Sequence, residues 1–425
     1  MIQKLSPSAG ARLSALTGRS RLKLGPSLTG LRIALYSPDS YGLGHFRRNR
    51  RIAEALVAAF PEAGVLLLTG CPAADRFAQP PRTDIVRLPA AVRHPDGSYT
   101  ARTLGVGPDH LTVLRSALLK AALNSFEPQI LIVDHNPAGR AGELKAALGA
   151  LNRHGRPALV ALGLRDILDD AAEVRRRWLR DGVYELLRWA YDEVWIFGRR
   201  EVFDTVGEYG VPPKLASRFH YLGYAIGPKV RRRRPERHVP VVVASGGGGE
   251  DARPMLETVI RARRRSKRRF RLIVLAGPLM GTPDRKALEA EGELAGPDVS
   301  VRGFTQNPIA LLRMADCVVT MGGYNSLLEA LSLGIPNLVL PRAWHLEPRV
   351  RAERMEAQGW TSCLPADQAT PENVLTRLLA LLGGEPQSRV PAKYLTGLVN
   401  LVARCQAVVS AAQTGPLQAA ESPLA

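Results

Sequence analysis

Short apolar runs alternate with longer stretches of helical periodicity along most of the chain. In the first half, runs rich in aliphatic and β-branched residues occupy positions 31–36, 65–69, 130–134, 158–162 and 193–197. A helical pattern follows the first of them, over 46–59, and another begins near residue 142. Buried apolar strands that alternate with amphipathic helices are typical of parallel sheets covered on both faces. The pattern therefore predicts a doubly wound α/β domain.

The periodic pattern stops between residues 227 and 240, where Gly, Pro and Arg predominate. A second series of apolar runs then begins, at 241–244, 272–276, 299–303, 317–320 and 337–340. The chain is therefore expected to form two α/β domains with flanking segments. These are a flexible basic tail over 1–29, an N-terminal domain over 30–226, a linker over 227–240, a C-terminal domain over 241–388, a helix over 389–413 that could pack back on the N-terminal domain, and a disordered tail over 414–425.

Composition agrees with two globular domains. The chain has 425 residues, too many for one ordinary domain, and 45% of them are hydrophobic, so both halves can bury a core. Four cysteines stand far apart, without the spacing of metal ligands, and we expect reduced core residues at Cys71, Cys317, Cys363 and Cys405. No stretch has the apolar length of a signal peptide or a membrane span. We therefore expect a cytoplasmic protein that could associate peripherally with the inner face of a membrane.

Basic residues exceed acidic ones by 58 to 39, which gives a formal net charge of +19. Arginine dominates the excess, in runs at 175–177, 231–234 and 261–271. Such runs form either solvated helix faces and a charged linker, or a surface for anionic lipid. Nucleic acid is a less favoured partner, because the runs lack interleaved aromatic residues and no nucleic-acid-binding motif is present.

A glycine-rich loop follows the first apolar run of the second domain and precedes a helical pattern that begins near residue 253. It consists of Ser245, Gly246, Gly247, Gly248 and Gly249. Backbone N–H groups of such a loop and the dipole of the next helix can converge on a phosphate. The loop lacks the Lys-Ser/Thr of a Walker motif and the third glycine of a dinucleotide fingerprint. Alternatively, the glycine-rich loop is a flexible strand-to-helix turn.

A second polar segment follows the apolar run at 317–320. It contains Gly322, Gly323, Asn325, Ser326 and Glu329. Ser326 and Glu329 have the spacing of a capping box, in which side chains satisfy the free amides at a helix start. Alternatively, the Glu329 carboxylate could accept hydrogen bonds from ribose hydroxyls, while the two glycines leave their amides to a diphosphate.

A third candidate is the loop after the first apolar run of the chain, where Gly44 and His45 precede Arg47, Arg48 and Arg51. His45 would lie on the opening turn of a helix, where a neutral imidazole could remove a proton or simply be hydrogen-bonded locally. Asp134 ends the apolar run at 130–134, at the sheet edge where open α/β sheets bind ligands. It could assist His45 or cap the next helix. Asp166 is a weaker candidate of the same kind.

Together with the segments at 303–308, 315–316 and 334–341, these motifs resemble those of GT-B glycosyltransferases. The nearest group is glycosyltransferase family 28, which includes the bacterial enzyme that adds N-acetylglucosamine to lipid-linked peptidoglycan precursors. The resemblance covers about residues 240–362 and, in the N-terminal half, mainly 31–56. It implies two Rossmann-like domains that face a central cleft, with the nucleotide sugar bound by the C-terminal domain and the acceptor by the N-terminal one.

Carried over residue by residue, the resemblance implies a donor site and a base. Phe304 would lie against the nucleotide base and Glu329 would bind the ribose hydroxyls. Phosphate and sugar contacts would come from Gly44, Ser245, Gly246, Gly247, Gly248, Gly322, Gly323, Asn325 and Ser326. His45, assisted by Asp134, would face the acceptor hydroxyl. In the peptidoglycan enzyme a Gln-rich segment followed by Asn-Ala touches the sugar, whereas here Glu347 opens the corresponding stretch, 347–352, so the identity of the sugar stays open.

Retaining GT-B enzymes usually carry a glutamate eight residues before the ribose-binding one, and Met321 stands there. The resemblance therefore implies an inverting transfer from a nucleoside-diphosphate sugar, with uridine as the favoured base, to a hydroxyl acceptor that the sequence does not name. No Asp-x-Asp motif or Cys/His cluster is present, so we expect neither a metal nor another cofactor. Two alternatives stay open: a nucleotide-sugar epimerase or hydrolase of the same fold, and a non-catalytic nucleotide-sugar-binding protein.

Overall fold

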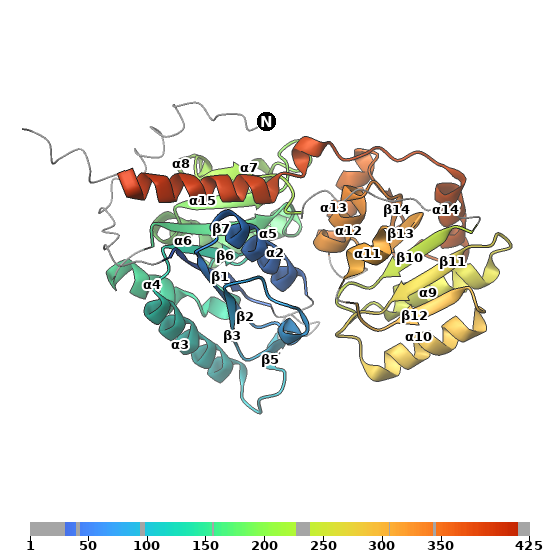
Figure 1. The fold of residues 1–425 in the computed structure, drawn as a ribbon, viewed down its shortest axis with the longest axis horizontal. Helices are drawn as coiled ribbons and strands as arrows, with labels where there is room; N and C mark the ends of the chain where they lie inside the picture. The colour runs from blue at the N-terminus through green and yellow to red at the C-terminus, as the bar shows by residue number, and fades with distance from the viewer. Residues whose placement is uncertain are drawn as a thin grey trace, which may run out of the picture.

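The computed structural model describes residues 30–39, 43–93, 98–154, 157–226, 239–305, 307–342 and 346–414. Within them the strands form a seven-stranded and a six-stranded parallel sheet, together with a short antiparallel pair. Each large sheet lies in its own lobe, as Figure 1 shows. The predicted tails, apart from Thr414, and residues 227–238 of the predicted linker lie outside the described residues. The predicted α/β class with two Rossmann-like sheets is confirmed.

The N-terminal sheet has the strand order β3-β2-β1-β6-β7-β8-β9. Its strands are β1 (Arg32–Ser37), β2 (Gly64–Thr69), β3 (Thr83–Arg87), β6 (Ile130–Asp134), β7 (Leu159–Arg165), β8 (Glu193–Phe197) and β9 (Phe219–Tyr221). The order reverses at β1, which pairs with β2 on one side and with β6 on the other. Ligands of open α/β sheets bind where the order reverses, beyond the carboxyl ends of the strands.

Helices and a small hairpin surround this sheet (Figure 1). The helices are α2 (Gly44–Ala59), α3 (Pro108–Phe126), α4 (Lys145–His154), α5 (Ala171–Arg180), α6 (Val183–Ala190), α7 (Thr205–Glu208) and α8 (Pro213–Ala216), with short 3₁₀ turns η1 (Ala74–Arg76) and η2 (Arg140–Gly142). The antiparallel pair joins β4 (Ala91–Arg93) to β5 (Tyr99–Ala101). Helix α2 begins seven residues after β1 ends, so its first turn lies at the reversal point of the sheet.

The C-terminal sheet has the order β12-β11-β10-β13-β14-β15 and reverses between β10 and β13. Its strands are β10 (Val241–Ser245), β11 (Arg271–Leu275), β12 (Val299–Arg302), β13 (Cys317–Thr320), β14 (Asn337–Val339) and β15 (Ser362–Cys363). The helices are α9 (Arg253–Arg265), α10 (Thr282–Leu294), α11 (Pro308–Leu312), α12 (Tyr324–Ser332), α13 (Leu346–Ala357) and α14 (Pro371–Gly383). The loops after β10 and β13 are the two glycine-rich segments, so both lie at the reversal point.

The last helix, α15 (Gly397–Thr414), follows the turn η3 (Ala392–Tyr394) and lies along the N-terminal domain (Figure 1). Leu398, Leu401 and Cys405 are buried in the same apolar cluster as residues of β1, β6 and β8. The Arg404 guanidinium forms a salt bridge with Glu193 on β8. The chain therefore returns from the C-terminal domain and covers the first one.

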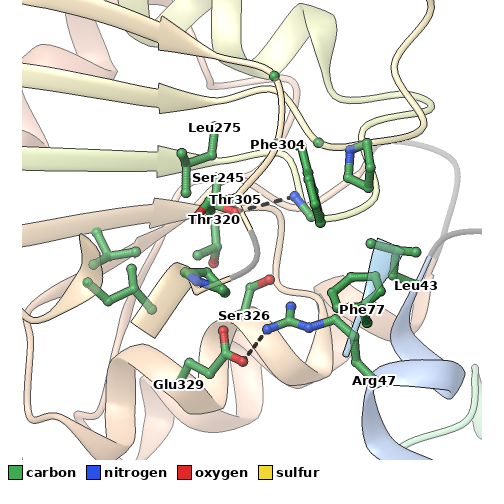
Figure 2. Close-up of a pocket in the computed structure, with 17 residues that line it drawn as sticks. Leu43, Arg47, Phe77, Ser245, Leu275, Phe304, Thr305, Thr320, Ser326 and Glu329 are labelled. Atoms are coloured by element: carbon green, nitrogen blue, oxygen red, sulfur yellow. Dashed lines mark hydrogen bonds and ion pairs between the residues drawn. The ribbon is translucent and has the colours of Figure 1, made fainter. Parts of the chain in front are cut away.

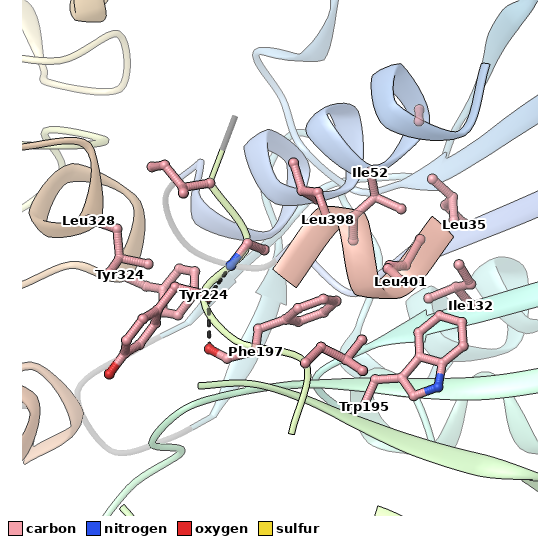
Figure 3. Close-up of a cluster of buried hydrophobic side chains, with 14 of the residues drawn as sticks. Leu35, Ile52, Ile132, Trp195, Phe197, Tyr224, Tyr324, Leu328, Leu398 and Leu401 are labelled. Atoms are coloured by element: carbon pink, nitrogen blue, oxygen red, sulfur yellow. Dashed lines mark hydrogen bonds between the residues drawn. The ribbon is translucent and has the colours of Figure 1, made fainter. Parts of the chain in front are cut away.

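The same apolar cluster joins the two domains (Figure 3). Tyr324, the first residue of α12, is almost fully buried, and its hydroxyl donates a hydrogen bond to the carbonyl of Phe197, at 2.8 Å. The amide of Ala225 donates to the same hydroxyl, at 3.1 Å. These bonds fix the start of α12, which carries the predicted donor residues, against the N-terminal domain.

Ion pairs engage most of the arginine run on α9. Arg261 and Arg264 pair with Glu291, Arg263 with Asp298, and Arg265 with Glu372. The four cysteines are free and buried, as expected. Within the described ranges, no helix has both the length and the apolar character needed to cross a bilayer.

Candidate functional site

A pocket opens between the domains, lined by residues of both (Figure 2). Five of the predicted donor residues line it: Ser245, Gly247, Phe304, Ser326 and Glu329. The N-terminal domain contributes Leu43, Arg47 and Phe77. The Phe304 ring meets that of Phe77 edge-on, with centroids 5.5 Å apart, so an aromatic pair from the two domains bounds the pocket.

The glycine-rich loop after β10 folds tightly against the loop that follows β11. Gly249 has a φ of +102°, and a Cβ there would lie 2.4 Å from the carbonyl oxygen of Ala276. The carbonyl of Gly248 accepts a hydrogen bond from the amide of Leu279, at 2.9 Å. Gly249 is therefore required by the backbone, whereas Ser245 and Gly247 line the pocket.

Helix α12 starts earlier than a capping box between Ser326 and Glu329 would require. Its N-cap is Gly323, which has no side chain to cap the first turn, and Glu329 lies in the second turn. The capping-box interpretation is therefore wrong, because the start of the helix is set by Gly322 and Gly323. Gly322 has a φ of +74°, and a Cβ there would lie 2.9 Å from the carbonyl oxygen of Pro348. The uncapped N-terminus leaves positive helix-dipole potential next to the pocket.

Glu329 is 2% exposed and is held by the N-terminal domain. Arg47 and Arg51 of α2 both donate to its Oε1 atom. Arg51 also donates to the Asn325 side-chain oxygen, at 3.3 Å. Burial lowers the pKa of Arg47 to about 10, and burial together with the Arg47 charge lowers the pKa of Arg51 to about 9. The predicted ribose-binding carboxylate thus has two cationic partners on the opposite domain, and the sequence analysis assigned neither of them a role.

His45 and Asp134 come together at the reversal point of the N-terminal sheet. His45 Nδ1 lies 2.8 Å from Asp134 Oδ2, and Arg48 donates to the other carboxylate oxygen. Burial alone would raise the pKa of the Asp134 carboxyl, but the charges of Arg48 and His45 outweigh it and hold that pKa well below its usual range. An ionised Asp134 favours the imidazole tautomer whose proton is on Nδ1, so Nε2 is the basic atom.

Arg165, at the end of β7, approaches that basic atom. Its Nη2 lies 3.3 Å from His45 Nε2, and its Nη1 donates to Glu347, at 2.8 Å. Arg351 also donates to Glu347, at 2.7 Å, and to Asp166, at 2.8 Å, with both members of the Arg351–Asp166 pair buried. Glu347 therefore lies beside the candidate base, and Asp166 is the partner of a buried cation.

Two further residues complete the surroundings of His45. The carbonyl of Gly44 accepts a hydrogen bond from the Asn325 side chain, at 2.8 Å, which joins α2 to α12. His135 has a φ of +67°, and its ring centroid lies 5.0 Å from that of His45. Burial, followed by the charges of His45 and Arg165, lowers the pKa of His135 well below its ordinary value, so its imidazole is neutral. In the part of the chain that the structure describes, no His, Cys, Asp and Glu side chains group in threes to hold a metal.

Two parallel-sheet domains that present their reversal points to a shared pocket define the GT-B fold class. Residues 241–394 match the sequence model of the glycosyltransferase family 28 C-terminal domain. This segment is therefore similar to the C-terminal domain of that family, which confirms the resemblance found in the motifs.

Solved structures share the whole fold at low sequence identity. CalG4, the calicheamicin glycosyltransferase, superposes with a TM-score of 0.59 at 16% identity, over 92% of this chain and all of that one. MurG of Acinetobacter baumannii gives 0.53 at 14% identity, over 90% and 98%. A protein of Listeria monocytogenes assigned as a UDP-N-acetylglucosamine 2-epimerase gives 0.58 at 13% identity, over 89% and 96%. These likenesses establish the GT-B fold.

Curated relatives match over a short segment. An uncharacterized glycosyltransferase of Methanosarcina mazei is 35% identical over 63 residues, which are 15% of this chain and 17% of the relative. One of Methanosarcina acetivorans is 36% identical over 63 residues, 15% of this chain and 16% of the relative. The matched segment thus spans about a sixth of the length of these relatives.

Proposed function

We propose that this protein is a glycosyltransferase that moves a hexose or an N-acetylhexosamine from a nucleoside-diphosphate sugar, UDP-linked by family resemblance, to a hydroxyl acceptor. The observation that carries the proposal is the His45–Asp134 pair at 2.8 Å. It lies at the reversal point of one sheet, in a GT-B fold whose second domain matches the family 28 sequence model. The pair supplies a base and the second domain supplies the donor site.

On the donor side, Phe304 would bound the base and Glu329 would accept the ribose hydroxyls. The diphosphate would lie between the glycine-rich loop and the start of α12, where the N-cap Gly323 has no side chain and the backbone amides of the first turn would face the anion. Helix-terminal amides stabilise the negative charge that develops as the nucleoside diphosphate leaves. With this stabilisation in the protein, the proposed transfer requires no metal or other cofactor.

On the acceptor side, His45 Nε2 would take the proton of the attacking hydroxyl, and Asp134 would stabilise the resulting imidazolium. The oxygen attacks the anomeric carbon as the diphosphate departs from the opposite face, which inverts the configuration. Met321 supports this single displacement, because it stands where retaining relatives carry a glutamate. The N-terminal domain would therefore bind the acceptor.

An epimerase or hydrolase is the second candidate, because His45, His135, Asp134 and Glu347 gather around one point. Such enzymes rely on acidic residues and histidines around the sugar. Here, however, arginines hold both carboxylates: Arg48 holds Asp134, and Arg165 holds Glu347. Because both carboxylates are paired with arginines, they are suited to stabilising charge rather than to exchanging protons. His45 is then the single base that sugar transfer requires.

Two measurements test the proposal. First, calorimetric titration of wild type and Glu329→Ala with a panel of nucleoside diphosphates should show selective binding of one of them, weakened by the substitution. Second, turnover of the matching nucleotide sugars with hydroxyl acceptors should be followed by an assay that separates transferred sugar, free sugar and epimer. Free sugar or epimer as the main product would favour the second candidate, and no binding of any nucleotide would contradict both.

A further inference from the structure

Two arginines of the N-terminal domain share one carboxylate oxygen of the C-terminal domain. Arg47 and Arg51 lie one turn apart on α2, and both donate to Oε1 of Glu329. Their side chains are 17% and 12% exposed, and Glu329 is almost fully enclosed. One carboxylate therefore neutralises only one of two guanidinium groups in a region with little water.

The surplus positive charge has few other partners nearby. Besides Glu329, Arg51 contacts the neutral Asn325 side chain. The next acidic residue on α2, Glu54, also acts on the Arg51 charge, but it is 64% exposed and forms its ion pair with Arg50. A buried charge without a matched counter-ion is unfavourable, so the arginine pair is suited to an additional anion.

The pocket lies where that anion would bind. Arg47 lines it together with Ser245, Gly247, Ser326 and Glu329, and Figure 2 shows its guanidinium pointing from α2 to Glu329. Ser326, in the first turn of α12, lines the same space as Ser245 and Gly247 of the glycine-rich loop. Three kinds of anion-binding group, from both domains, therefore surround one position.

We infer that Arg47 and Arg51 bind the diphosphate of the donor. In the donor-free protein the two arginines bind Glu329, the carboxylate that accepts hydrogen bonds from the ribose once the donor is bound. The inference rests on the proposed function. When the donor binds, its diphosphate replaces Glu329 as the partner of the two guanidinium groups, and its ribose hydroxyls donate hydrogen bonds to Glu329. Every charged group therefore keeps a partner. Because α2 also carries His45 in its first turn, donor binding and placement of the base are coupled through one helix.

The arginines are tested by calorimetry at fixed ionic strength, with the nucleoside diphosphate that wild type binds best among UDP, dTDP, GDP, ADP and CDP. Arg47→Gln and Arg51→Gln should each weaken its binding by about tenfold to a hundredfold, the range of a charge-assisted hydrogen bond. Binding of the corresponding nucleoside, which has no phosphate, should be unchanged or stronger. Arg50→Gln, on the same helix but with its guanidinium bonded to the Ala78 carbonyl and Glu54, is the control and should match wild type. Circular dichroism checks that each variant folds.

Glu329→Gln gives a second test, in which anion binding should become stronger rather than weaker. The probe is inorganic pyrophosphate. Freeing the arginines should strengthen pyrophosphate binding by about tenfold while nucleoside binding weakens. Glu62→Gln removes the same charge from the exposed surface, where the carboxylate pairs with Arg82, and controls for net charge. If wild type binds a nucleoside diphosphate but the arginine variants bind it equally well, the inference is overturned and the donor site stands. If wild type binds none, the proposed function fails and the inference fails with it.

Discussion

The Nδ1 atom of His45 lies 2.8 Å from Oδ2 of Asp134, although 89 positions separate the two residues in the chain. The pairing follows from the topology, because β1 and β6 are neighbours in the sheet, Asp134 is the last residue of β6, and His45 lies in the first turn of the helix that follows β1. Arg48, one turn after His45 on α2, holds the other oxygen of Asp134. The dyad is therefore fixed from two sides before any substrate binds.

His45→Ala should abolish most of the sugar transfer and leave donor binding intact. Loss of a general base lowers the rate by roughly a hundredfold to ten-thousandfold, whereas the donor pocket is lined by other side chains of α2 and of the C-terminal domain. The measurement is kcat with the assigned donor, alongside calorimetric Kd for the nucleoside diphosphate. His110→Ala, an exposed residue of α3, is the matched control. Equal kcat in His45→Ala and wild type would remove His45 from the mechanism.

Asp166→Asn should destabilise the protein without removing its chemistry. The carboxylate pairs with the buried Arg351, and breaking such a pair costs about 3 kcal/mol because one charge is left uncompensated. The free energy of unfolding in urea measures the loss, and kcat per folded molecule should stay within about threefold of wild type, since a group outside the chemistry adds little to the barrier. A normal stability with a collapsed kcat would instead place Asp166 among the catalytic groups.

Burial explains which strands the sequence predicts. β1, β6, β8 and β10 are buried along nearly their whole length, so their apolar runs are unbroken. The strands that the apolar pattern missed lie at sheet edges. β3 carries the exposed Asp84 and Arg87, β9 has three residues and β15 has two. Edge strands meet water on one side, so their hydrophobic pattern is weak.

The candidate site, like the set of strands, contains residues that the sequence predicts and residues that it does not. Asp134 and Ser245 end their strands and His45 lies in the first turn of the helix after β1. Such residues are predictable because strand ends meet at one edge of a parallel sheet. The partners of Glu329 are not, because Arg47 and Arg51 reach it only when the two domains dock. The spacing of Ser326 and Glu329 suggested a capping box that the structure does not contain, because the N-cap is Gly323, three residues before Ser326.

His135 should make the protein sensitive to mild acid. Its imidazole is neutral in the fold because burial and two neighbouring charges lower its pKa well below 6.5, whereas the unfolded chain takes up a proton near pH 6.5. Stability is therefore constant above about pH 7 and falls by up to about 1.4 kcal/mol for each unit below about pH 6.5. The free energy of unfolding in urea at pH 7.5, 6.5 and 5.5 measures this slope.

His135→Asn removes that proton acceptor and keeps a residue that tolerates a positive φ. The variant should lose less stability than wild type between pH 6.5 and 5.5. Asp134 does not interfere, because its lowered pKa contributes stability that is present above about pH 4 and is lost only as the pH falls further. Parallel slopes for the variant and wild type would show that His135 is protonated equally in both states.

Alanine substitution at two glycines should distinguish an effect on stability from an effect on donor binding. A Cβ at Gly249 would lie 2.4 Å from the Ala276 carbonyl oxygen, so Gly249→Ala should lower the free energy of unfolding by about 2 kcal/mol or more, through steric strain at a positive φ. A Cβ at Gly323 would meet no atom of the described residues within 4 Å, and its φ of −62° suits any residue. Gly323→Ala should therefore keep the stability of wild type. Its methyl group would project beside the start of α12, where the proposed diphosphate approaches the backbone, so nucleoside diphosphate binding should weaken by about tenfold, the effect of losing one close backbone contact. Thermal denaturation and calorimetry on both variants make the comparison, and unchanged affinity in Gly323→Ala would move the diphosphate away from this helix end.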